Sequence, residues 1–227
     1  QAATSNAPAV FTHADMDYSM PSDITVVDTN QNGVADRAYV GDVGGNVWRI
    51  DLAEYGGSSD SRDTWQVSRL AALGAGSSPG IVRFFHAPDV ILARDKRNTG
   101  TTANPLLANR DYIGVAIGSG NRADPLDKGG SPENFMYMIK DRRTAEGSGV
   151  DTGLTHVDFG DVTSNCLQNG GTCIVNLTNG WRLELEEPGE KVLATALTIT
   201  GKTFFTTYMP FSGTGATACS PSEGAGR

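Results

Sequence analysis

A nine-residue loop near the amino terminus carries oxygen-bearing side chains at regular intervals. Asp or Asn occupies its first, third, fifth and ninth positions, and Gly33 occupies the sixth. The seventh position would contribute a backbone carbonyl. The candidate ligands are Asp28, Asn30, Asn32, Val34 and Asp36. Calcium takes six to eight oxygen ligands, and a glycine at the bend lets alternate side chains converge on one centre. The pattern therefore predicts one calcium ion, held for a structural purpose.

The residues around this loop argue against an EF-hand. An EF-hand has a bidentate Glu at its twelfth position, where this chain has Tyr39. The flanks Ile24–Val27 and Arg37–Val40 have the β-branched and apolar character of strands. We therefore expect a strand–loop–strand site in which the ion joins two neighbouring strands. The competing interpretation is an Asn-Gly-rich turn without metal, because Asp and Asn favour turns in any protein.

Catalytic patterns find little support in the sequence. The three histidines show no zinc-ligand spacing with the cysteines. Ser119, between two glycines, is typical of a turn at a strand end. Glu184, Glu186 and Glu187 alternate with Leu183 and Leu185, as on an exposed strand face. We expect no catalytic residue and a protein that is not an enzyme.

The cysteines favour an oxidising compartment. Cys166 and Cys173 enclose the hexapeptide Leu-Gln-Asn-Gly-Gly-Thr, a length that can close a small disulfide-bonded hairpin. Cys219 has no evident partner within the chain. We predict a bond between Cys166 and Cys173 in an exported protein.

The overall composition limits the possible partners. The 227 residues are 38% hydrophobic and 19% charged and include 28 glycines, a mixture that suits an extracellular all-β protein with many tight turns. The net charge of −8 argues against binding the phosphate backbone of nucleic acids. Two basic segments, Arg94–Arg97 and Lys140–Arg143, each contain an aspartate and are interpreted as solvated turns. No apolar run is long enough to span a membrane, and we expect the chain to be a piece of a longer protein.

Short apolar and β-branched runs recur between Gly, Pro, Asn and Asp residues, as in an all-β fold. Two hairpins are expected, with two-residue turns at Gly44-Gly45 and at Gly201-Lys202. Long loops are expected at 95–110 and 121–133, and a surface insertion at 144–176. The predicted strands are Ile24–Asp28, Arg37–Val43, Asn46–Leu52, Trp65–Leu70, Asp89–Ala93, Tyr112–Gly118, Asn134–Lys140, Cys173–Leu177, Trp181–Leu185, Val192–Thr200 and Thr203–Tyr208.

A glycine-rich cue followed by a strand that ends at Asp is repeated along the chain. It spans Gly41–Asp51 and recurs, more loosely, in Gly118–Asp141. Four-stranded propeller blades usually recur at about 40–50 residues. The eleven predicted strands would make about three blades. We therefore expect residues 1–227 to be part of a single β-propeller domain with open ends.

Several segments, in this order, resemble the C-terminal region of the PilY family, the large adhesins at the tip of bacterial type IV pili. The resemblance covers most of the chain outside about 144–176. The matching segments are Asp28–Asp36, Tyr39–Leu52, Ile117–Arg122, Asn134–Asp141, Gly180–Leu185, Gly189–Ala194 and Phe204–Pro210, continuing to Cys219.

The resemblance implies a modified, quinoprotein-like β-propeller with calcium bound in the loop of one blade. It also implies that calcium occupancy regulates pilus extension and retraction, and hence twitching motility and surface attachment. The implied partners are minor pilins at the pilus tip and a host or abiotic surface. The implied location is the cell surface, at the pilus tip or associated with the outer membrane. Two alternatives remain: a quinoprotein dehydrogenase, whose vicinal cysteine pair is absent here, and a stand-alone lectin-like or integrin-like propeller module.

Overall fold

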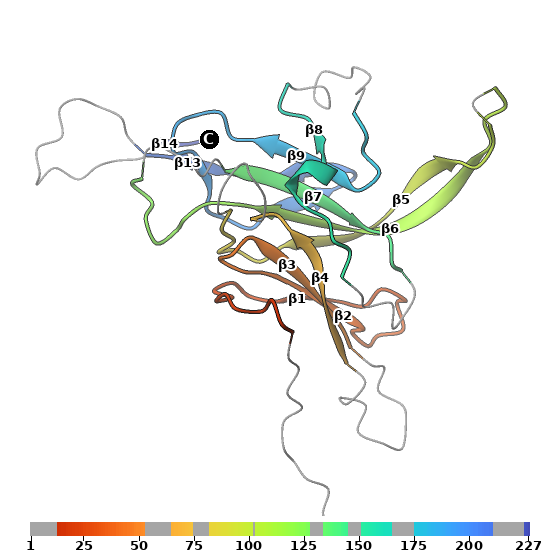
Figure 1. Ribbon diagram of the computed structural model, residues 1–227, viewed down its shortest axis with the longest axis horizontal. Coiled ribbons are helices and arrows are strands. Elements are labelled where there is room, and N and C mark those ends of the chain that lie inside the picture. Colours follow the sequence, from red (N-terminus) through yellow and green to blue (C-terminus); the bar gives the residue numbers. More distant parts are fainter. Residues whose placement is uncertain are drawn as a thin grey trace, which may run out of the picture.

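The computed structural model describes residues 13–52, 65–74, 82–101, 103–127, 134–144, 151–164, 175–210 and 225–227. These residues form an all-β structure with two principal sheets, one above the other in Figure 1. Among them, no helix is long and apolar enough to cross a membrane.

The first sheet is antiparallel and has its strands in sequence order. It comprises β1 (Thr25–Val27), β2 (Arg37–Gly41), β3 (Asn46–Asp51) and β4 (Gln66–Ala72). This is the up-and-down arrangement expected of a propeller blade. The β1–β2 and β2–β3 pairings are those predicted from the sequence.

The second sheet has the order β5-β6-β7-β9-β8. Its strands β5, β6, β7 and β9 pair antiparallel, whereas β8 runs parallel to β9. The strands are β5 (Asp89–Asn98), β6 (Leu107–Gly118), β7 (Phe135–Asp141), β8 (Gly160–Asp161) and β9 (Gly180–Glu184).

Two smaller sheets complete the described fold. One joins β10 (Lys191–Val192), β13 (Thr207–Met209) and β14 (Ala225–Gly226). The other is the hairpin of β11 (Leu197–Ile199) and β12 (Lys202–Phe204). The long strands predicted at 192–200 and 203–208 are therefore each divided in two. Of the strand predicted at 173–177, residues 175–177 are not a strand, and the rest lies outside the described residues.

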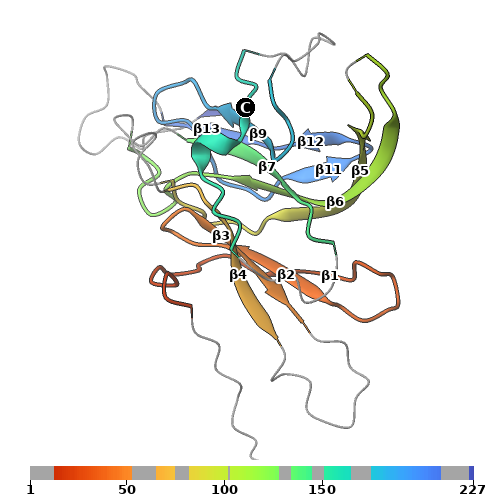
Figure 2. The same cartoon turned by 45° about the vertical axis from the view of Figure 1, so that its right-hand side comes forward.

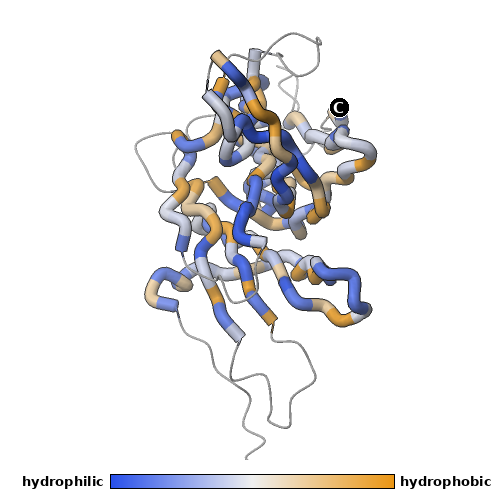
Figure 3. The backbone as a smooth tube through the Cα atoms, turned by 90° about the vertical axis from the view of Figure 1, so that its right-hand side faces the viewer, coloured by the Kyte–Doolittle hydropathy of each residue, from blue (hydrophilic) through white to orange (hydrophobic). Residues whose placement is uncertain are grey.

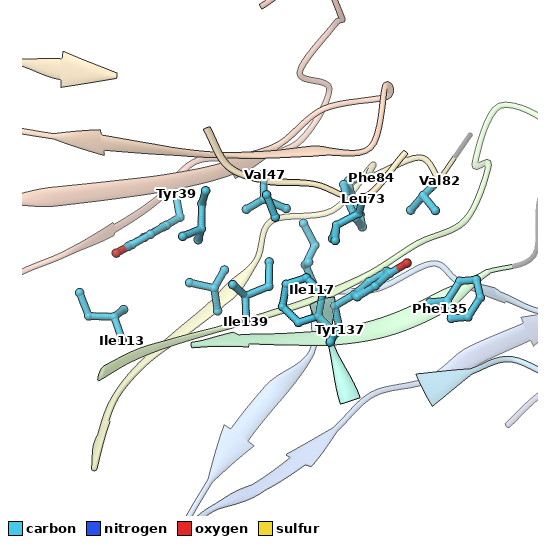
Figure 4. Close-up of a cluster of buried hydrophobic side chains, with 14 residues drawn as sticks. Tyr39, Val47, Leu73, Val82, Phe84, Ile113, Ile117, Phe135, Tyr137 and Ile139 are labelled. Carbon is cyan, nitrogen blue, oxygen red and sulfur yellow. The ribbon is translucent and has the colours of Figure 1, made fainter. Parts of the chain in front are cut away.

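The principal core lies between the two large sheets. Tyr39 and Val47 of the first sheet face Ile113, Ile117 and Tyr137 of the second (Figure 4). Side chains alternate between the two faces of a strand, which produces the changes in hydropathy along the tube in Figure 3. The other face of the second sheet is also covered by a cluster of buried residues: Ala116, Met136, Met138 and Ala196. Burial on both faces explains why β6 and β7 are apolar at nearly every position near their centres.

Both predicted hairpins form, but their turns differ from the prediction. Asp42 pairs with Asn46, which leaves a three-residue loop with Gly45 at φ 83°, in place of the expected two-residue turn. The buried Asp42 carboxylate accepts hydrogen bonds from Asn46, from the Gly44 N–H and from Trp48 Nε1. These bonds favour the longer loop.

The second turn lies one residue earlier than expected. Ile199 pairs with Lys202, so Thr200 and Gly201 form the two-residue turn, with φ angles of 49° and 77°. Two positive φ angles are characteristic of the type I′ turn that suits a hairpin.

Residues 95–110, expected to be a loop, instead extend β5 and β6 into a long hairpin. The register runs unbroken from Asp89↔Ala116 to Asn98↔Leu107. This distal hairpin, formed by residues 94–101 and 103–111, is called the arm below. Figures 1 and 2 show it curving away from the body of the molecule.

The described part of segment 144–176 belongs to the fold and is not the expected surface insertion. A 3₁₀ helix, His156–Asp158, precedes β8, which pairs with β9. Phe159 and Val162 are buried. The sequence of this segment does not predict its place in the core, because only a few apolar side chains are buried among small and polar residues. Residues 145–150 and 165–174 lie outside the described part of the chain.

Candidate metal centre

The predicted calcium loop connects β1 to β2, as the strand–loop–strand interpretation requires. The last pair of the ladder is Val27↔Arg37, so residues 28–36 extend beyond the end of the sheet. Gln31 and Gly33 have φ angles of 61° and 89° and turn the loop back on itself. A Cβ added at Gly33 would meet nothing within 4 Å, so Gly33 is required for its backbone angle.

Three predicted ligands direct side-chain oxygens toward the middle of the loop. The Gly33 N–H donates to Asp28 Oδ2 at 2.7 Å, and the Asn32 N–H lies 3.3 Å from Asp28 Oδ1 and 3.1 Å from Asn30 Oδ1. The Val34 N–H donates to Asn32 Oδ1 at 2.8 Å. Asp28, Asn30 and Asn32 are thus brought together by the backbone of the loop itself.

The fourth side-chain ligand, Asp36, is at the neck of the loop. Its carboxylate accepts hydrogen bonds from the Thr29 N–H, at 3.2 Å to each oxygen, and from Thr29 Oγ1 at 2.7 Å. Asp36 is 2% exposed, whereas Val34 is exposed. The Asp36 backbone also receives the Leu52 N–H and donates to the Val27 carbonyl. Asp36 therefore joins the loop to β1 and to the end of β3.

The chemical types of the candidate ligand atoms are those that calcium prefers. The set consists only of oxygens, from two carboxylates and two amides, which are hard ligands. An ionised carboxylate has about four acceptor positions, and the two N–H donors on Asp28 leave others for an ion. Asp28, Asn30 and Asn32 would hold the ion from one side, and Asp36 would close the site after loosening its bonds to Thr29.

A buried ionic network begins immediately after the loop. Arg37 is 1% exposed, and its Nη2 donates to the Thr144 carbonyl at 2.6 Å. Its Nε lies 3.4 Å from Asp51 of β3. Because Arg37 follows Asp36 directly, the loop end and this network share one strand.

The network continues across the interface between the two sheets. Arg49 of β3 donates hydrogen bonds to Asp51 on the same strand. Its Nη1 also donates to Asp141 Oδ2 of β7, at 2.8 Å. Arg143 Nε lies 3.2 Å from Asp141. Burial, together with the nearby Asp141 carboxylate, raises the pKa of Tyr39, so its hydroxyl stays protonated and donates. A buried ion pair is tolerated when further hydrogen bonds support it, and Arg49 Nη1 also donates to the Arg143 carbonyl at 2.7 Å.

A second group of possible metal ligands was not anticipated from the sequence. His13, Asp15 and Asp151 bring ligand atoms within 4.8 Å of one another. Contacts within the protein account for all three side chains without a metal. His13 Nε2 lies 3.1 Å from Asp151. Arg69 forms an ion pair with Asp15, and its backbone N–H donates to Asp151. The guanidinium would oppose a cation. Spacing in the sequence could not reveal this group, since Asp15 and Asp151 are 136 positions apart.

The serine and glutamate residues considered in the sequence analysis lie in strands and turns of the fold. Ser119 is buried, and its hydroxyl accepts the Phe135 N–H at 2.8 Å, which fixes the end of β6 to β7. Glu184 is in β9, and Glu187 is in the turn that follows, where its carbonyl accepts the Glu190 N–H. Cys166, Cys173 and Cys219 lie outside the described residues.

The paired sheets and the connecting loop define an all-β chain of the propeller class. The model of the PilY1 β-propeller domain matches residues 16–170, and the chain therefore belongs to the PilY1 β-propeller family. The match includes the loop, the first sheet and the arm.

Curated relatives and a solved structure agree with this assignment. Over 201 residues the chain is 29% identical to the type IV pilus biogenesis factor PilY1 of Pseudomonas aeruginosa strain UCBPP-PA14, covering 73% of this chain and 17% of that protein. It is 26% identical to the PilY1 homolog of Xylella fastidiosa strain Temecula1, covering 87% and 13%. The crystal structure of the P. aeruginosa PilY1 C-terminal domain shares the fold, with a TM-score of 0.59 and 20% identity over 88% of this chain and 46% of that one. The chain thus spans less than a fifth of either curated relative.

Proposed function

We propose that this chain is the calcium-binding portion of an exported type IV pilus biogenesis factor and adhesin. The observation that carries the proposal is the convergence of Asp28, Asn30 and Asn32 oxygens in a loop that ends in the buried Asp36. Family membership supports the link to pili. In this proposal the protein acts at the pilus tip or outer membrane, through minor pilins and a host or abiotic surface.

Calcium would act by ordering strands, without a chemical step. In the absence of the ion, the carboxylates of Asp28 and Asp36 repel each other, and binding removes that repulsion. Because Asp36 is bonded to the ends of β1 and β3, ordering the loop would stiffen the first sheet. Arg37 and Arg49 would pass this restraint to β7 through Asp51 and Asp141.

The functional consequence would be a change in the balance between pilus extension and retraction. Calcium occupancy would favour one arrangement of the propeller within the assembled tip, and would thereby regulate twitching motility and surface attachment. A ligand shifts such an equilibrium only as far as its affinities for the two arrangements differ.

Isothermal titration calorimetry tests the binding. The chain should bind one calcium ion, and Asp28→Ala should abolish the heat of binding. A matched control is Asp23→Ala, which removes an exposed carboxylate that precedes β1 and lies outside the loop. In the full-length protein, Asp28→Ala should alter pilus number or twitching while the protein is still exported.

Two results would contradict the proposal. Equal calcium affinity in the parent and Asp28→Ala proteins would remove the loop from consideration. Calcium-dependent turnover of an alcohol or sugar, lost in Asp28→Ala, would replace the non-enzymatic role with the quinoprotein-like alternative.

A further inference from the structure

The two basic segments that are far apart in the sequence meet beside the arm. Arg94–Arg97 lies on β5, and Lys140–Arg143 lies at the end of β7. Both segments, together with Leu177 and Thr178, line a cleft of about 410 Å³. Its charged lining is Lys96, Arg97, Arg110, Lys140, Arg142 and Asp95. Five cations and one carboxylate leave an excess of four positive charges, in a chain whose net charge is −8.

The aspartates within the two segments do not neutralise this cleft. Asp141 faces the opposite side of β7, where it is 1% exposed and bonds Arg49 and Tyr39. Only Asp95 is in the cleft, and it is already engaged by Lys140 at 3.0 Å and Arg142 at 2.6 Å. Alternation of side chains along a strand therefore separates the charges that the sequence mixes.

Three cations of the cleft form no ion pair with another residue in the described part of the chain. Among the described residues, no carboxylate lies within ion-pair distance of Lys96, Arg97 or Arg110. Burial, and then the proximity of Arg142 and Arg97, lowers the pKa of Arg110. This crowding of like charges would be relieved by an anion. Arg142 is held in place by Asp95 and by the Thr178 carbonyl, so part of the site is already ordered.

We propose that this cleft binds an extended acidic segment of a protein partner. The backbone of β5 favours a polypeptide, because β5 is the edge strand of its sheet and pairs only with β6 among the described strands. Every second residue of an edge strand directs its N–H and C=O groups outward, where another extended chain can pair. Four successive β5 residues, 95–98, line the cleft, so charge and backbone recognition are adjacent.

The shape and chemistry of the cleft disfavour other polyanions. Lys140 and Arg142 lie over the Tyr112 ring, at 5.0 and 5.5 Å from its centre, so this ring is not free to stack on a sugar. The side chains of Lys140 and Arg142 are 14% and 13% exposed, recessed between the arm and the body. A flat lipid surface would not reach them.

A labelled peptide of alternating glutamate and glycine tests the proposal by fluorescence anisotropy. Arg97→Gln and Arg110→Gln should each weaken peptide binding about tenfold, the loss expected for one charge-assisted hydrogen bond. The matched control is Arg94→Gln, which is on the same strand and removes the same charge but pairs with Asp111 and does not line the cleft. The affinity of the Arg94→Gln protein for the peptide should stay within about twofold of that of the parent protein. Added salt should weaken the complex of the parent protein with the peptide.

Three outcomes would overturn the proposal. The first is peptide binding that is absent or is unchanged in Arg97→Gln, an exposed position where folding is not at issue. The second is equal weakening by Arg94→Gln, which would indicate a diffuse charge effect. The third is binding of vesicles containing anionic lipid, of a sulfated polysaccharide or of pyrophosphate in place of the peptide. A thermal melt of every variant would verify that it is folded.

Discussion

The phenolic oxygen of Tyr39 on β2 lies 3.0 Å from a carboxylate oxygen of Asp141 on β7. The two residues are 102 positions apart, and both are buried. Their contact joins the sheet that carries the candidate calcium loop to the sheet that carries the arm. It also marks the edge of the core, where apolar packing gives way to the network of Arg37, Arg49 and Asp51.

Removing the acid of this pair should be much more damaging than removing the hydroxyl. Tyr39→Phe deletes one hydrogen bond and should lower the free energy of unfolding by about 1–2 kcal/mol. Asp141→Ala leaves Arg49 and Arg143 without a shared counter-charge and should cost about 3–5 kcal/mol. Urea denaturation measures both. Equal effects would mean that Asp141 does not organise the network.

Glycine positions distinguish backbone strain from lack of space. Gly45 has φ 83°, and a Cβ there would come within 2.6 Å of the Gly74 nitrogen. Gly201 has a similar φ of 77° but nothing within 4 Å. Gly201→Ala should therefore cost about 1 kcal/mol, from backbone strain alone. Gly45→Ala should cost at least about 2 kcal/mol more, because the two turns must move apart. Thermal denaturation of the two variants compares them, and similar losses would contradict the crowding at Gly45.

Local patterns in the sequence predict the parts of the fold that depend on near neighbours. The strands flanking the calcium loop and the hairpin around Gly44-Gly45 follow from alternation and glycine placement. The turn at Asp42 is one residue longer than predicted, because the indole of Trp48 reaches back to the Asp42 carboxylate. The candidate ligands could be selected by spacing, but the bonds between Thr29 and Asp36 could not.

The arm and the cleft depend on partners distant in the sequence. Residues 95–98 are polar and resemble a loop, but Asp95 lies opposite Arg110 and Arg94 pairs with Asp111 across the hairpin. Cross-strand pairs of opposite charge stabilise a sheet without an apolar pattern. Arg97 and Arg142 line the same cleft only because β5, β6 and β7 are aligned in one sheet. No short window of the sequence contains all three strands.

The buried His156 should make stability depend on pH. Burial, with a smaller effect from Arg182, lowers the pKa of His156 from its ordinary 6.5 to about 4. Tyr137 Oη lies 2.9 Å from its Nδ1. Below about pH 6.5 the unfolded chain takes up a proton that the folded protein does not. The contribution of neutral His156 to the free energy of unfolding is thus fully present above that pH and is lost as the pH falls to about 4. The loss is about 1.4 kcal/mol for each unit by which the pKa differs between the folded and unfolded states.

Urea denaturation between pH 7.5 and 4.5 checks this dependence. His156→Asn should reduce the slope in that range, because Asn does not titrate and can still accept the Tyr137 hydrogen bond. His86, whose pKa is also lowered by burial, would leave a remaining slope of the same sign in the variant. An unchanged slope in His156→Asn would show that His156 does not account for the effect.

Calcium should raise the melting temperature if the loop binds it in the folded state alone. A ligand at about a hundredfold excess over its Kd adds about 2.7 kcal/mol. The gain should be lost in Asp28→Asn, which retains an acceptor for the Gly33 N–H but removes one of the two charges. Asp36→Ala is a less specific test, since it also deprives Thr29 of its acceptor and should lower the melting temperature without calcium.

Hydrogen exchange with and without calcium locates the effect. Protection should increase mainly at residues 24–43, because the loop ends on Asp36, whose backbone N–H bonds Val27 at 3.1 Å. A smaller increase should reach β7 through Arg49 and Asp141. Asp141→Asn should suppress this distant increase and leave the change in the loop intact, since Asp141 contacts no loop residue in the hydrogen bonds of the described chain. Protection that spreads evenly over both sheets, or that persists in Asp28→Asn, would place the ion elsewhere.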